Sequence, residues 1–320
     1  MNILLHGIML GLSCIVVFSA HAQGYPDKPV KIIVGFAPGG SSDIVARLVA
    51  QRLSPILGQP VVVDNKSGAA GVPGADFVAK APGDGYTLLL ATSGHATTAA
   101  IMKKLPFDPV KDFAWITMVT TYPLVFATAS QSSFKSLPEL IARAKAQPGT
   151  VSYSSTGIGS ALHLVGEWFS AETGIELLHI PFRGGPSTLT EVLSGRIDIM
   201  VETITLALPH IQGGKLRALA VTARQPMNFL PGVPPAIQTV PGFEFQSWLG
   251  IAAPPGTPAV IVERLNREIH RILEQPEMRQ RLADLGGVAA PTSPDAMRAQ
   301  VESEVTRWRR LVEVRGIERQ

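Results

Sequence analysis

The groups in this sequence with the clearest chemical use are the backbone amides of a glycine-rich turn. Val30–Val34 is a short, β-branched apolar run, which is typical of a strand buried on both faces. Gly35–Ser41 follows as a turn, and Ser42 and Asp43 are good N-cap residues for the helix that comes next. Free N–H groups and the partial positive charge of a helix N-terminus together bind a carboxylate or a phosphate. An ordinary tight strand-to-helix turn is the alternative.

The anion-binding interpretation makes a specific prediction for Gly39, Gly40 and Ser41. Their N–H groups should donate to a ligand carboxylate, and a Cβ at Gly40 should either meet the ligand or strain a positive φ. Gly40→Val is therefore expected to abolish binding, with little change in the melting temperature of the empty protein.

Ionisable side chains are a second set of candidates. Glu202 directly follows the apolar run Ile197–Val201, so its carboxylate needs a partner, either a loop N–H or an ammonium group on a ligand. Arg183 is a candidate for pairing with a ligand carboxylate, with an exposed rim position as the alternative. His95 and His163 lie in or just after small-residue loops, where each could donate to an anion or be a plain core-edge imidazole.

No set of residues assembles into an enzyme active site. Acid–base chemistry would need Asp43, Asp198 and Glu202, but the first two are more simply a helix cap and a strand-end residue. The dinucleotide pattern G-x-G-x-x-G is only partly matched at 157–162, and neither G-x-S-x-G nor G-x-x-x-x-G-K-[ST] occurs. The histidines lack metal-ligand spacing. The sequence therefore predicts binding without chemistry, and neither a metal nor a cofactor.

The elements that must position these groups alternate between strands and helices, which predicts an α/β fold. Several strands end in loops of small residues, and in a parallel sheet such loops share the carboxyl edge, where α/β proteins bind ligands. Helices are expected after Ser136, Thr257 and Ser293, each a good N-cap residue. The predicted strands cover residues 30–34, 61–64, 86–91, 115–121, 124–129, 151–154, 177–180, 197–201, 216–221 and 247–253.

The composition and the N-terminal segment indicate the class of protein and the compartment in which it acts. The chain has 320 residues, is 46% hydrophobic and carries a net charge of only +3, which gives no argument for a nucleic-acid partner. Ile3–Ala20 is almost wholly apolar and is followed by the A-x-A pattern Ala20-His21-Ala22, so residues 1–22 are predicted to be a secretory signal peptide. An uncleaved anchor and a lipoprotein signal at Cys14 are the alternatives. Because Cys14 is the one cysteine, the exported protein would have no disulfide.

Several ordered motifs resemble one protein family. Among them are Phe36-Ala37-Pro38-Gly39-Gly40-Ser41-Ser42-Asp43 and Pro181-Phe182-Arg183-Gly184-Gly185. Further matching segments lie at 25–30, 65–71, 82–88, 154–163, 207–211, 214–220 and 253–258. Together they are similar to the Bug family, the TctC-type periplasmic solute-binding proteins of tripartite tricarboxylate transporters. The resemblance covers nearly the whole exported chain.

The resemblance implies a two-domain, type II-like Venus flytrap with a ligand cleft between its domains. One domain would comprise residues 25–122 plus 245–320, and the other residues 123–244. The ligand would be a small carboxylate or an amino acid, and the partners would be membrane permease subunits, with the binding protein itself a monomer. Carried over position by position, the ligand-binding residues would be Phe36, Ala37, Gly40, Ser41, Ser93, Gly94, His95, Ser155, Thr156, Gly157, Ser160, His163, Gly184, Gly185 and Glu202.

Glu202 refines the expected ligand. A glutamate at this position favours a ligand with an amine over a simple polyanion, because an ionised carboxylate in a closed cleft needs a partner. Glu202→Gln should then weaken an amine-bearing ligand at least tenfold, which lies within the roughly 2–5 kcal/mol expected for such a pair, and leave a dicarboxylate unharmed or better bound. Two other functions stay open: a ligand sensor for a signalling partner, and an exported enzyme on the same scaffold.

Overall fold

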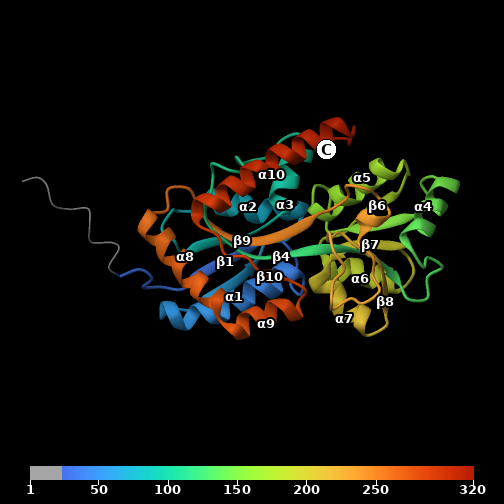
Figure 1. The fold of residues 1–320 in the computed structure, drawn as a ribbon. Coiled ribbons are helices and arrows are strands. Elements are labelled where there is room, and N and C mark those ends of the chain that lie inside the picture. The colour runs from blue at the N-terminus through green and yellow to red at the C-terminus, as the bar shows by residue number, and fades with distance from the viewer. Residues whose placement is uncertain (1–23) are drawn as a thin grey trace, which may run out of the picture.

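The computed structural model describes residues 24–320, so the predicted signal peptide and Cys14 lie outside the described residues. Figure 1 shows two lobes side by side, connected by a long strand, β4 Ala114–Ala129, that runs through both. The helices are α1 Ser41–Leu57, α2 Val72–Ala79, α3 Gly94–Ile101, α4 Leu137–Ala146, α5 Ala161–Thr173, α6 Gly185–Leu193, α7 Ile204–Gln212, α8 Ala259–Glu274, α9 Pro276–Asp284 and α10 Pro294–Val314, with short 3-10 turns η1 Ala69–Gly71 and η2 Ala236–Gln238.

The first lobe is built on three parallel strands. They are β1 Val30–Val34, β2 Val61–Asn65 and β3 Thr87–Thr92, with β1 in the centre. In β1, Val30, Ile32, Ile33 and Val34 are fully buried, as the apolar run predicts for a strand inside a sheet. The loops after these strands therefore lie at one carboxyl edge, which confirms the arrangement predicted from the sequence.

Two antiparallel strands connect the lobes. β4, Ala114–Ala129, pairs with β9, Gln246–Ala253, along its first part and with β7 and β8 along its second part. The change of partner falls after Pro123, opposite Gln246. The sequence predicted two strands broken at Tyr122-Pro123, and that prediction was wrong because the proline sits within one continuous strand where the pairing changes.

The second lobe repeats the pattern of the first. Its strands are β5 Ser152–Ser155, β6 Leu178–Pro181, β7 Ile199–Thr203 and β8 Leu216–Val221. β5 lies between β6 and β7 and is parallel to both. Asp198 is a structural residue, as expected, because its carboxylate accepts hydrogen bonds from the backbone and hydroxyl of Ser152.

The C-terminal helices return to the first lobe. α10 packs on α3 and β4, and the short strand β10, Val288–Ala289, pairs with β4. The end of α10 also meets the second lobe, where Arg315 pairs with Glu172 at 2.6 Å and the Trp308 ring lies edge-on to Trp168. Figure 1 shows α10 running across both lobes on one side.

Candidate functional site

A cavity that is partly open to solvent lies where the two lobes meet. Its lining comes from strand ends and helix starts on both lobes and from the connecting strands β4 and β9. The lining residues are Phe36, Ala37, Gly40, Ser41, Ser42, Thr92, Ser93, Gly94, Tyr122, Thr156, Ser160, Ala161, Leu162, Gly185, Glu202, Thr203 and Ser247. Hydroxyl groups dominate this set, and among the described residues that line the cavity there is no Lys or Arg.

Five of the described helices begin at this cavity. The lining includes the first residues or N-caps of α1 (Ser41), α3 (Gly94), α5 (Ser160), α6 (Gly185) and α7 (Thr203). The first N–H groups of a helix have no acceptor inside the helix, and the macrodipole adds about half a positive charge at that end. The cavity is therefore electropositive without a basic side chain.

The strand ends and the connecting strands β4 and β9 add hydroxyl groups. The Ser93 and Ser247 hydroxyls lie 2.7 Å apart, so the N-cap of α3, just after β3, is hydrogen-bonded to β9 at the cavity. Burial raises the pKa of the Tyr122 phenol to about 12; the hydroxyls of Ser247 and Ser41 lower it, and the Glu202 carboxyl raises it. Tyr122 is therefore a neutral hydroxyl that can donate to a ligand oxygen.

Glu202 is the carboxylic group of the cavity and is only 2% exposed. Its Oε1 accepts from the Thr203 N–H at 2.8 Å and faces the Thr203 hydroxyl at 3.0 Å. Its Oε2 lies 3.2 Å from the Thr188 hydroxyl. Burial raises the pKa of Glu202 to about 7, against these hydrogen bonds, which lower it. Of the two partners predicted for this carboxylate, the structure supplies the loop N–H.

The glycine-rich turn differs from the prediction at two residues, Gly39 and Gly40. The Gly39 N–H donates to Asp43 Oδ2 at 3.0 Å, so it is already engaged, and Gly39 does not line the cavity. Gly40 has φ −79°, not a positive value, and a Cβ built there would lie 3.5 Å from the Ala37 carbonyl oxygen, an ordinary contact. The prediction that Gly40→Val would strain a positive φ is therefore wrong. Asp43 was expected to cap a helix, but its bonds hold the turn.

His95 lies outside the cavity lining. Its Nε2 is 2.8 Å from the Pro109 carbonyl oxygen, and its ring packs against Phe107, Phe113 and Trp115. Burial lowers the pKa of His95 to about 4, although the bond to Pro109 raises it. The imidazole is therefore neutral and buried at neutral pH, which is the core alternative and not the anion donor.

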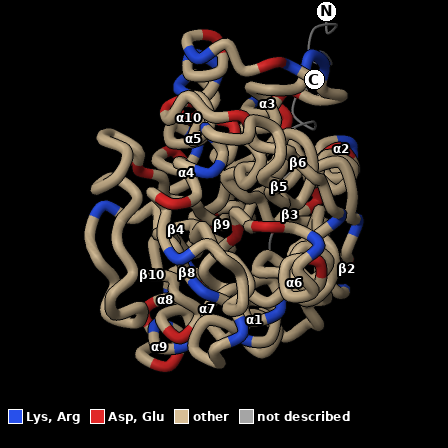
Figure 2. The backbone as a smooth tube through the Cα atoms, turned by 90° about the vertical axis from the view of Figure 1, so that its right-hand side faces the viewer, with Lys and Arg blue, Asp and Glu red and all other residues tan. Residues whose placement is uncertain are grey.

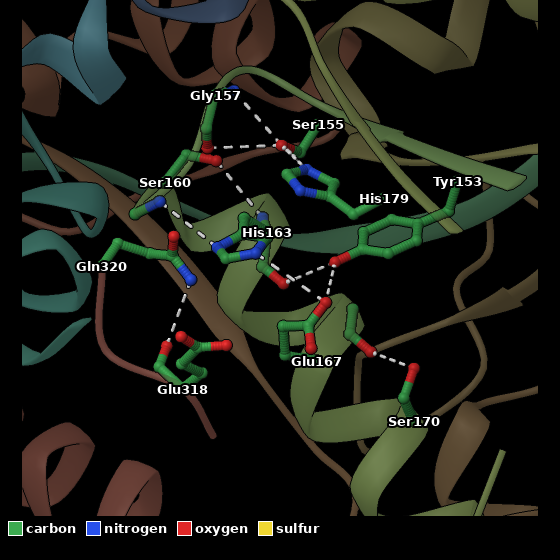
Figure 3. A network of polar contacts seen from close by, with 12 residues as sticks. Tyr153, Ser155, Gly157, Ser160, His163, Glu167, Ser170, His179, Glu318 and Gln320 are labelled. Carbon is green, nitrogen blue, oxygen red and sulfur yellow. Dashed lines mark hydrogen bonds and ion pairs between the residues drawn. The ribbon is translucent and has the colours of Figure 1, made fainter. Parts of the chain in front are cut away.

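His163 and Ser155 belong to a polar network behind the cavity wall (Figure 3). His163 Nδ1 accepts from the Gly159 N–H at 3.2 Å, and its ring packs against His179 at a tilt of 31°, with centroids 4.2 Å apart. The Ser155 hydroxyl lies 2.7 Å from His179 Nε2. Burial, together with the neighbouring His179, lowers the pKa of His163 to about 3. These contacts hold the loop that carries Thr156 and Ser160, which do line the cavity.

The remaining predicted residues form the contact between the lobes around the cavity. A Cβ on Gly184 would lie 2.8 Å from Ala37 Cβ, and one on Gly157 would lie 3.3 Å from the Ala70 nitrogen. The hydroxyls of Thr97 and Thr98 both lie 3.0 Å from the Gly159 carbonyl oxygen across the same boundary. The lobes are therefore in close contact, with the cavity between them.

The predicted residues thus divide into two groups. Those at the cavity are Phe36, Ala37, Gly40, Ser41, Ser93, Gly94, Thr156, Ser160, Gly185 and Glu202, and those outside its lining are Gly39, His95, Ser155, Gly157, His163 and Gly184. The lining residues that were not predicted are of two kinds. Ser42, Thr92, Ala161, Leu162 and Thr203 adjoin predicted residues, whereas Tyr122 and Ser247 lie on the connecting strands and carry no loop signal.

Charged groups do not gather at the site. In residues 24–320 as drawn in Figure 2, Lys and Arg are scattered among Asp and Glu. Arg183 is exposed and absent from the cavity lining. Within the described residues, no group of His, Cys, Asp and Glu has the arrangement of a metal site. None of the helices in this part of the chain combines the length and apolar character that crossing a bilayer requires.

Comparison with solved structures defines the class of protein. The fold matches the periplasmic binding protein BugD with a TM-score of 0.89 and 33% identity, over 92% of this chain and 100% of that chain. A Rhodopseudomonas palustris protein with bound malate, MatC, matches with a TM-score of 0.86 and 32% identity, over 90% and 100%. The R. palustris protein Rpa4515 with adipate matches with a TM-score of 0.89 and 33% identity, over 92% and 99%. The chain has the two-domain α/β fold of periplasmic binding proteins.

The family follows from a second match. Residues 45–317 match the model of the tripartite tricarboxylate transporter family receptor, TctC. The chain belongs to this family, which confirms the resemblance seen in the sequence motifs.

Proposed function

We propose that this protein binds a small dicarboxylate in the cavity between its lobes and delivers it to the membrane permease subunits of a tripartite transporter. The observation that carries the proposal is the convergence of five helix N-termini on a cavity whose described lining has no Lys or Arg. Carboxylates are stabilised at such ends. The malate and adipate in two similar structures support the same ligand class.

The character of the lining supports capture followed by release. Serine and threonine hydroxyls and helix N–H groups can surround both ends of a short diacid, and the apolar Phe36, Ala161 and Leu162 can contact the carbon chain between them. A fixed Arg–carboxylate pair would bind more tightly and discriminate more strictly. The lining therefore favours small diacids of more than one length.

We further propose that ligand release involves a movement of residues 25–122 plus 245–320 against residues 123–244. The change of β4 pairing after Pro123 and the start of β9 at Gln246 support these boundaries. Residues 1–22 would direct export and be removed, and the protein would act in the periplasm as a monomer that carries out no reaction on its ligand.

Calorimetric titration of the purified protein tests this function. Malate, succinate and adipate should bind with one ligand per chain, and the dimethyl esters of the same acids should not, because they have lost the charges that the helix N-termini stabilise. Equal binding of acids and esters, or no binding of any of these acids, would contradict the proposal. A chromatographic mass measurement on the same sample tests whether the protein is a monomer.

A further inference from the structure

Glu202 is the most unusual group of the cavity because it is a buried carboxyl in a site that attracts anions. It lies at the junction of β7 and α7, close to Gly185, where a built Cβ would lie 3.1 Å from Glu202 Oε2. An ionised carboxylate at this point would repel a ligand carboxylate, since both need the same electropositive surroundings.

The single hydroxyl hydrogen of Thr188 bears on whether Glu202 is ionised or protonated. The Thr188 hydroxyl has a single hydrogen, and its Oγ1 lies 2.7 Å from the Gly185 carbonyl oxygen, which can only accept. The same Oγ1 lies 3.2 Å from Glu202 Oε2. This hydrogen can go to Oε2, where it stabilises the ionised Glu202, or to the Gly185 carbonyl, which is the shorter contact. With the hydrogen on Gly185, the contact with Oε2 becomes a hydrogen bond only when the proton sits on Glu202. A protonated Glu202 donates to Thr188 Oγ1 and still accepts the Thr203 N–H at Oε1.

Within residues 24–320, Glu202 takes part in no ion pair, and no cation is among the causes of its raised pKa. β4 brings Tyr122, a neutral phenol, and α6 brings Thr188. Charged groups of α1 and α5 have partners of their own. Asp43 pairs with Arg47 at 2.9 Å, and Glu167 accepts the Tyr153 hydroxyl at 2.6 Å and lies 3.8 Å from His163 Nε2. Burial raises the pKa of Glu202 to about 7, so its charge changes within the physiological range.

We propose that Glu202 couples ligand capture to proton uptake: the cavity closes on a dicarboxylate with Glu202 as a neutral carboxylic acid. This inference rests on the proposed function and names how the same site selects its ligand. Above pH 7, binding joins the ionised protein, one dianion and one proton from solvent into a single complex, and no other bond forms or breaks. The neutral acid holds no charge for an ammonium group, so Glu202 also selects diacids over amino acids.

Calorimetry of the whole exported protein at pH 6.5 and pH 8.5 tests the coupling. Malate and succinate are dianions at both values, so the ligand charge stays constant. With a free-protein pKa near 7, affinity should fall about twentyfold between the two values, and titration in buffers of different ionisation enthalpy should show uptake approaching one proton per ligand at pH 8.5. Glu202→Gln should bind equally at both values and take up no proton.

A matched control separates this site from buried carboxyls in general. Glu304 in α10 is also buried, with a raised pKa caused first by burial, and it accepts the Trp248 indole N–H at 2.8 Å, away from the cavity lining. Glu304→Gln should keep the pH dependence of binding. The number of protons that the wild-type protein takes up per ligand tests the inference even if Glu202→Gln fails to fold.

Three results would overturn the inference. Tight dicarboxylate binding that is equal at both pH values and takes up no proton would show that Glu202 does not change charge. The same pH dependence in Glu202→Gln would assign it to another group. Aspartate or glutamate binding more tightly than succinate, without proton uptake, would show an ionised Glu202 paired with an ammonium group. Absence of carboxylate binding at both pH values is a different outcome, because it would overturn the proposed function itself.

Discussion

Closure of the two lobes depends on the absence of a side chain at Gly184. This residue is the N-cap of α6 on the second lobe and faces Ala37 in the glycine-rich turn of the first lobe. Its φ of 169° is extended backbone that alanine adopts without strain. A Cβ at this position would lie 2.8 Å from Ala37 Cβ, and its next contacts, the Ala37 nitrogen and Cα at 3.5 and 3.7 Å, are ordinary. Gly184→Ala therefore introduces a single clash.

The size of that clash sets the expected loss of affinity. Carbon atoms in contact stand about 3.5–4.0 Å apart, so the lobes must separate locally by roughly 1 Å or distort. Overpacking of this kind costs about 1–3 kcal/mol, which corresponds to roughly five- to 150-fold weaker ligand binding. The clash forms between lobes, so the melting temperature of the ligand-free protein should be almost unchanged.

Calorimetric titration with malate or adipate measures the effect, and the double variant Ala37→Gly, Gly184→Ala is the matched control. Removing the Ala37 Cβ removes the one atom that clashes, so the double variant should regain most of the lost affinity. Wild-type affinity in Gly184→Ala would show that the lobes do not approach this closely when the ligand is bound. A double variant as weak as the single one would show that the loss has another cause.

Two further predictions concern stability. Burial alone would raise the pKa of Asp43, but hydrogen bonds from Arg47, Gly39 and Asn65 lower it; Asp43→Ala should therefore lower the free energy of unfolding by about 1–3 kcal/mol at pH 7, and urea unfolding at pH 3 should show a smaller difference because the unfolded group protonates near pH 4. Burial holds the pKa of His95 near 4, whereas the unfolded histidine takes up a proton below about pH 6.5. The free energy of unfolding should therefore fall by about 2 kcal/mol between pH 7 and pH 5. His95→Phe should lose that much less stability over the same interval, and an identical loss in both proteins would contradict the argument.

Short-range patterns determined the elements of the fold. The β-branched run at 30–34 and the mostly apolar run at 216–221 became β1 and β8 with the predicted bounds. Ser136 and Ser293 each accept a hydrogen bond from a backbone N–H in the first turn of the helix that they cap. Such features depend on a few neighbouring residues, because side-chain volume and local hydrogen bonding decide them. The prediction failed at Pro123 in β4, because whether a proline fits within a strand depends on how the partner strand pairs.

The sequence by itself determined which loops carry the site, and the motifs determined the family. Only the tertiary structure decided which atoms are free to bind. It engages the Gly39 N–H with Asp43, buries His95 among aromatic rings, and brings Tyr122 and Ser247 from distant strands to the cavity. The protonation of Glu202 is decided at the same level, because burial and the hydroxyl of Thr188 act on it from residues that are not its neighbours in the chain. Hydrogen-bond partners and desolvation are properties of the packed structure, and a linear pattern does not contain them.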